Sequence, residues 1–147
     1  MNENVKLIRK RIEHLRRMQT YLDYSLTQTL PLLPIADFQT LTPGQHETLA
    51  AFRVRFSEMQ EQLGKTMRAI ALEEEKNTEP FSVVLLYMTK LDILDSVEQW
   101  KLIRESRIAN CEMRLTMSTK KTASAFLNFF RSWLKHPQCS RFGLTAL

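Results

Sequence analysis

The chain has 147 residues, with 44% hydrophobic and 25% charged side chains and a net charge of +5. That length and balance are ordinary for one soluble globular domain with a buried core, and no low-complexity tract or internal repeat is visible. Glycines number three and prolines five. Because these residues punctuate turns, their scarcity predicts long uninterrupted elements.

The order of the residues argues against several further classes. The longest apolar runs are a few residues, far shorter than the roughly 20 that a transmembrane helix needs. No apolar run follows Met1, so we expect no signal peptide. Cys111 and Cys139 lack CxxC spacing and do not form a disulfide framework. We therefore expect a cytoplasmic, reduced protein without a membrane segment, metal or cofactor.

The first predicted helix extends to about Thr29, where Pro31 and Pro34 end it. Apolar residues recur along it at spacings of three, four and seven, which is the pattern of one buried face. They are Val5, Ile8, Ile12, Leu15, Leu22 and Leu26. Residues 32–41 follow as an apolar-rich connector without periodicity.

The second predicted helix starts at Pro43, with Thr42 as its N-cap and Gln45 completing a capping box. A heptad-like apolar stripe then continues for about eight turns. Its members are Leu49, Phe52, Phe56, Met59, Leu63, Met67 and Ile70. Gly64 lowers helix propensity, which is consistent with close packing against another helix. Three glutamates at 73–75 oppose the helix dipole, so we expect fraying there.

Two shorter helices are predicted next. One opens at Pro80 and ends near residue 90; it includes residues 82–87, the best strand candidate of the chain, in a helical context. The other begins at Val97 behind a capping box of Ser96 with Gln99. On it, Val97, Trp100, Ile103 or Leu102, and Cys111 lie near one face.

A fifth predicted helix runs from about Lys121 to Lys135, and Pro137 stops it. Its aromatic set covers more than one stripe and belongs to the core or, alternatively, to a dimer or partner surface. The set is Phe126, Phe129, Phe130 and Trp133. The expected fold is all-α, an antiparallel up-and-down bundle of four to five helices. Residues 1–137 would form the single domain, and 138–147 a loose tail.

Residues 91–107, LDILDSVEQWKLIRESR, resemble the core of the HEPN superfamily, in its branch of HepT-like toxins and nucleotidyltransferase substrate-binding subunits. The likeness is strongest from Thr89 to Arg107. Family members continue with Asn after the arginine and then a His and a Tyr on the same helix. This chain has Ile108, Glu112 and Arg114 at those positions.

The resemblance implies a metal-independent ribonuclease centre in which the arginine holds the phosphate and the histidine moves a proton. Neither Arg104 nor Arg107 has a histidine four to six residues later. Glu112 would share a helix face with Arg107 and would neutralise it rather than replace an imidazole. Three explanations stay open: divergence into a binding subunit, a toxin with a dead centre, or a disrupted reading frame around residues 108–119.

The resulting hypothesis is a non-catalytic HEPN-like protein that homodimerises and pairs with a small nucleotidyltransferase encoded nearby. Arg104, Arg107 and Glu112 mark its remnant cleft; an exposed ion-pair set is the plain alternative. One rival hypothesis is an active ribonuclease toxin that uses Arg107. Another is a nucleic-acid-binding bundle whose candidates crowd the first helix. These candidates are Lys6, Arg9, Lys10 and Arg17.

Two other arginine–histidine pairs fit the loose spacing, Arg9 with His14 and Arg131 with His136. Neither follows the Trp100 landmark, and short motifs match by chance. His136 would serve the dipole at a helix C-terminus, and His46 would be an exposed residue of a first helical turn. Neither pair is therefore expected to be catalytic.

Overall fold

The computed structural model describes residues 2–111 and 117–142, with side chains described outside 106–119. Every regular element in these ranges is helical, which confirms the all-α class and places residues 82–87 in a helix. The long helices are α1 (Glu3–Thr29), α2 (Pro43–Glu73), α4 (Val97–Cys111) and α5 (Met117–Leu134). The shorter ones are η1 (Leu30–Leu32), η2 (Phe38–Thr40), α3 (Phe81–Lys90) and α6 (Pro137–Ser140).

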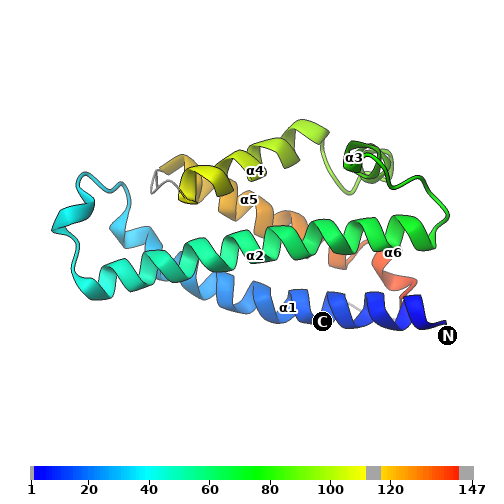
Figure 1. The fold of residues 1–147 in the computed structure, drawn as a ribbon, viewed down its shortest axis with the longest axis horizontal. Helices are drawn as coiled ribbons and strands as arrows, with labels where there is room; N and C mark the ends of the chain where they lie inside the picture. Colours follow the sequence, from blue (N-terminus) through cyan, green and yellow to red (C-terminus); the bar gives the residue numbers. More distant parts are fainter. Residues whose placement is uncertain (1, 112–116, 143–147) are drawn as a thin grey trace.

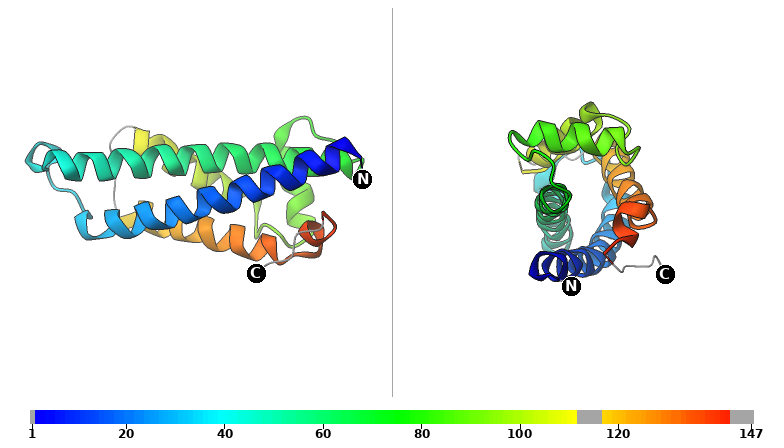
Figure 2. Two further views of the ribbon diagram at one scale, coloured as in Figure 1. Left: turned by 90° about the horizontal axis from the view of Figure 1, so that it is seen from below. Right: turned by 90° about the vertical axis from the view of Figure 1, so that its right-hand side faces the viewer.

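The four long helices form an antiparallel up-and-down bundle (Figure 1). α1 and α2 make a long hairpin, and α4 and α5 make a shorter antiparallel pair along its flank. Viewed from the end, the order around the core is α1, α2, α4, α5, so α1 is diagonal to α4 (Figure 2). α3 lies across the bundle and packs against α2 and α4.

The predicted apolar stripes supply the core. All seven stripe residues of α2 are buried, as are Ile8, Ile12, Leu15, Leu22 and Leu26 of α1. The aromatic set of α5 is buried in the same cluster, so these residues belong to the core of this chain. On α4, Trp100 and Ile103 face inward and Leu102 is exposed.

The predicted starts of α2 and α4 are confirmed, whereas Pro80, expected in the first turn of α3, is its N-cap. Gln45 N donates to Thr42 Oγ1 at 3.2 Å, and Thr42 N donates to Gln45 Oε1 at 2.9 Å, which completes the capping box of α2. Before α4, Gln99 N donates to Ser96 Oγ at 3.1 Å. The Gln99 amide oxygen, however, accepts from Asp95 N at 3.2 Å. In the expected capping box the Gln99 side chain would accept from the main chain of Ser96, but it accepts from the main chain of Asp95 instead.

The end of α2, where the sequence predicts fraying, is closed by hydrogen bonds. α2 ends in a Schellman motif, in which Lys76 N donates to Ala71 O at 2.9 Å and Glu75 N to Leu72 O at 3.0 Å. Glu75 takes the left-handed conformation of the motif, with φ 58°. These bonds satisfy carbonyls at the end of the helix and outweigh the unfavourable dipole of the glutamates.

The loose tail expected from residue 138 is also wrong for residues 138–142. Pro137 opens α6, and Gln138, Cys139 and Phe142 are buried. Trp133 Nε1 donates to Gln138 Oε1 at 2.9 Å, which gives the buried indole its acceptor. The segment therefore closes one end of the bundle.

Candidate functional site

The structure describes only part of the segment that resembles the HEPN motif. Arg104 lies on α4 with an exposed side chain. Arg107 belongs to the same helix, but its side chain and Glu112 lie outside the described residues. A shared cleft of Arg104, Arg107 and Glu112 therefore remains a prediction.

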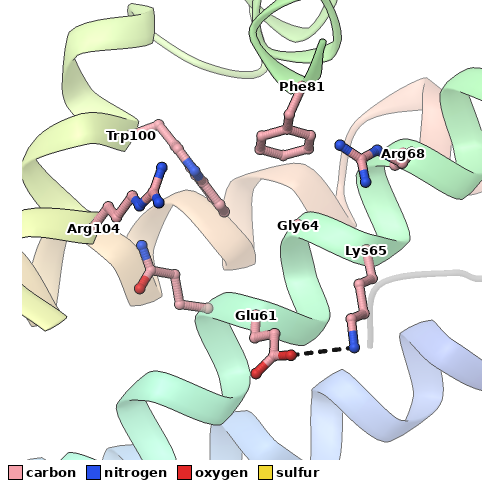
Figure 3. A pocket seen from close by; sticks show the side chains of 8 residues that line it. Glu61, Gly64, Lys65, Arg68, Phe81, Trp100 and Arg104 are labelled. Carbon is pink, nitrogen blue, oxygen red and sulfur yellow. Dashed lines mark ion pairs between the residues drawn. The ribbon is translucent and has the colours of Figure 1, made fainter. Parts of the chain in front are cut away.

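Arg104 lines a groove of about 280 Å³ between α2, α3 and α4 (Figure 3). α2 provides the largest part of the wall, because residues three and four apart on a helix share a face. The lining residues are Gln60, Glu61, Gly64, Lys65, Arg68, Phe81, Trp100 and Arg104. The groove thus combines cationic, aromatic and amide side chains from three helices.

Two aromatic rings form the apolar part of the groove. The ring centroids of Phe81 and Trp100 lie 6.1 Å apart, with an angle of 59° between the planes. A Cβ atom on Gly64 would lie 3.5 Å from each ring. A Cβ atom at this distance would be in ordinary van der Waals contact with both rings, so their approach to α2 does not require glycine at position 64. Arg68 stands 5.1 Å over the Phe81 ring in a cation–π contact.

The groove carries more positive than negative charge. Lys65 pairs with Glu61 at 3.2 Å and Arg68 with Glu79 at 4.0 Å, both exposed pairs that contribute little. Arg104 has no ion-pair partner among the described side chains. Figure 3 shows Arg104 on one side of the aromatic pair and Lys65 and Arg68 on the other. An anion in the groove would meet cations from two directions.

Gln60 adds an unsatisfied polar atom to this wall. Its side chain is 3% exposed, and its Oε1 atom has no hydrogen-bond partner among the described residues. A buried carbonyl oxygen without a donor is unfavourable by about 1–3 kcal/mol. The Oε1 atom has almost no accessible surface, so this cost belongs to the packing of the fold and does not by itself point to a ligand.

The basic candidates of the first helix do not join the groove, since α1 is diagonal to α4 in the bundle (Figure 2). Lys6 pairs with Glu3 at 3.0 Å, and the half-buried Arg9 donates from Nε to Phe142 O at 2.9 Å. Both of these cations have intramolecular partners. Lys10 and Arg17 are exposed.

In the other arginine–histidine pairs, Arg131 and His136 have structural roles. Arg131 binds Asp23 through two bonds of 2.6 and 2.8 Å. His136 N-caps α6, with Nδ1 accepting from Gln138 N at 3.1 Å and Nε2 lying 3.0 Å from Leu91 O. The expected dipole role at the C-terminus of α5 is replaced by this cap, because Pro137 starts a new helix. His14 and His46 are exposed.

The described ranges show neither a metal-binding cluster nor a membrane-spanning helix. No group of three or more His, Cys, Asp or Glu side chains there is arranged to hold a metal ion. Within the same ranges, none of the helices combines the length and apolar character that crossing a membrane requires.

Sequence reasoning identified Arg104 but missed Gln60, Lys65, Arg68 and Phe81. Their spacing on α2 was a usable signal, since 60, 64 and 68 are four residues apart. The sequence carried no signal that these residues would meet side chains of α3 and α4. Comparison with family models, curated proteins and solved structures finds no match. The likeness to HEPN proteins therefore rests on the residues from Thr89 to Arg107.

Proposed function

We propose that this protein is a non-catalytic, HEPN-like binding protein of the cytoplasm that holds a phosphate-bearing ligand in the groove between α2, α3 and α4. One observation carries the proposal. Arg104, which has no ion-pair partner among the described side chains, shares a groove with Lys65 and Arg68.

The chemistry of the groove favours binding over catalysis. Guanidinium groups donate paired hydrogen bonds to phosphate oxygens, and Arg104 is available for such contacts. None of the eight lining residues is a histidine or cysteine, so a side chain suited to proton transfer near neutral pH is missing from that set. The groove supports a ligand-holding role.

The resemblance of residues 89–107 supports two partners for this role. Members of that family homodimerise and pair with a small nucleotidyltransferase, as toxin–antitoxin modules or as substrate-binding subunits. We carry both partnerships over as part of the proposal. Sedimentation of the purified protein as a monomer, or its failure to co-purify with the neighbouring nucleotidyltransferase, would remove the corresponding partner.

Titration calorimetry with inorganic pyrophosphate tests the groove itself. Arg104→Gln should weaken binding about tenfold, since a charge-assisted hydrogen bond contributes about 1.5–3 kcal/mol. Lys101→Gln is the matched control, because Lys101 is exposed on the same helix and pairs with Glu98 at 3.3 Å. Equal losses in both variants, or no binding by the parent protein, would contradict the proposal.

Incubation with RNA separates a binding protein from the rival ribonuclease. We expect intact RNA after incubation. Cleavage that disappears in Arg107→Ala would show an active centre on α4 and overturn the non-catalytic proposal. Cleavage that persists in this variant would indicate a contaminating nuclease, and a mock purification from cells without the protein would then show the same cleavage.

A further inference from the structure

A second surface of the molecule runs along the outside of α1. Seven exposed residues follow one another at alternating spacings of three and four: Leu7, Lys10, His14, Arg17, Tyr21, Tyr24 and Gln28. A row with this spacing drifts by only about 20° per heptad, so these residues lie in one line. We call them the outer row of α1. The row is exposed along its length, and at Tyr21 it borders α2.

The outer row combines cations with aromatic rings. None of its seven members is acidic, and the exposed Glu13 lies about one turn from both Lys10 and Arg17 on the same helix. Lys10 and Arg17 have no ion-pair partner among the side chains that the structure describes. Tyr21 and Tyr24 are 58% and 62% exposed, which is unusual for such large apolar surfaces on adjacent turns. The row therefore offers positive charge at one end and open aromatic rings at the other.

Arg55 of α2 brings a positive charge to the aromatic end, where Glu58 of the same helix also lines the pocket beside Tyr21. Its guanidinium lies 5.5 Å over the Tyr21 ring. It is held there by a hydrogen bond of 2.6 Å from Nη1 to Ser25 Oγ. Arg55 therefore covers one face of Tyr21 and partly orders the ring. Because the ring is already ordered, it would lose less conformational entropy when a base stacks on it.

This combination fits single-stranded nucleic acid. Phosphates along a strand match separated cations, and bases that are not paired stack on exposed aromatic rings. A duplex keeps its bases inside and offers no face to the tyrosines. From Lys10 to Tyr24 the row spans fourteen residues, about 21 Å at 1.5 Å per residue, which accommodates several nucleotides. A second copy docked row against row would bring positive side chains together.

We propose that the outer row of α1 is a binding track for single-stranded nucleic acid, with Lys10 and Arg17 on the phosphates and Tyr21 and Tyr24 stacked on bases. The track is separate from the groove at Arg104, because α1 is diagonal to α4. It does not depend on the function proposed for that groove.

Fluorescence anisotropy with a labelled oligouridylate of about twelve nucleotides tests the track. Tyr21→Ala with Tyr24→Ala should weaken binding about tenfold or more, while Tyr21→Phe with Tyr24→Phe should retain it, because stacking needs only the ring. Lys10→Gln with Arg17→Gln should reduce the slope of log K against log salt by about 1.4, or about 0.7 for each phosphate that the variant no longer neutralises.

Matched variants elsewhere on the surface complete the experiment. Lys90→Gln with Lys121→Gln removes the same charge from exposed sites on α3 and α5, and Leu72→Ala with Leu86→Ala trims exposed apolar side chains. Both pairs should leave the affinity within about twofold. The proposal would be overturned by equal losses in these controls. It would also be overturned if Arg104→Gln lost binding while the variants of the outer row kept it, or if the protein bound phosphatidylserine vesicles but not the oligonucleotide. Self-association that depends on the two tyrosines, without nucleic-acid binding, would overturn it as well.

Discussion

Glu74 illustrates how a single side chain connects elements that are distant in the chain. Its carboxylate accepts hydrogen bonds from Tyr87 of α3 and, at 3.3 Å, from Gln138 of α6. It also pairs with Arg141 at 2.8 Å, and its side chain is only 10% exposed. The sequence of three successive glutamates does not indicate which side chain is buried. The geometry of the C-terminal turn of α2 places Glu74 inward.

Cys139 permits a prediction about pH at the residue scale. Burial raises the pKa of the Cys139 thiol from 9.0 to about 12, although the positive charge of Arg16 acts in the opposite direction. The folded state therefore holds the thiol proton more tightly than the unfolded chain. This contribution to stability is complete below pH 9 and is lost as the pH rises from about 9 to 12.

Urea unfolding at a series of pH values checks this prediction. We expect the free energy of unfolding to fall above pH 9 in the parent protein, and to fall less steeply in Cys139→Ala, which has no thiol at this buried position. All other ionisable groups, Cys111 included, are common to both proteins, so only the difference in slope reports on Cys139. Identical slopes would show that Cys139 does not contribute.

At the element scale, α2 combines strong helix signals with one weak point. The capping box at Thr42 and the apolar stripe act within a few residues of chain, and both appear in the structure as the sequence predicts. Gly64 sits in the middle, where glycine is unfavourable in a helix by about 1 kcal/mol relative to alanine. Whether a side chain fits at this position depends on its distance from Phe81 and Trp100.

Gly64→Ala should stabilise the protein. The added Cβ would be in ordinary contact with Phe81 and Trp100, at 3.5 Å from each. The gain should be about 0.5–1 kcal/mol, or a rise in melting temperature of about 3 °C by circular dichroism. Gly44→Ala, in the first turn of the same helix, is the control and should gain less, because glycine is less unfavourable near a helix start. A lower melting temperature for Gly64→Ala would mean that the rings cannot accommodate a methyl group.

At the scale of the whole molecule, residues 137–142 connect α1, the end of α2 and α5. Arg9 near the start of α1 binds the main chain of Phe142, and Gln138 connects Trp133 with Glu74. Buried positions at Cys139 and Phe142 extend the core to this end of the bundle. The segment is a structural part of the domain.

A chain ending at His136 should therefore be markedly less stable. Its truncation removes the acceptor of the Trp133 indole and the buried Phe142 side chain, so we expect a loss of about 3 kcal/mol or more. The midpoint of urea unfolding, monitored by tryptophan fluorescence, measures this loss. An unchanged midpoint would show that residues 137–142 pack without contributing to stability.

The sequence alone determined the helical class, the helix starts at Pro43 and Val97, and the buried faces of α1 and α2. These properties depend on periodicity and on hydrogen bonds between residues a few positions apart, which can be read along the chain. Only the tertiary structure decided that Gln60 and Arg68 meet Phe81 and Arg104 in one groove, and that residues 138–142 close the bundle. Such contacts join residues that are distant in sequence, and they follow from how whole helices pack against one another.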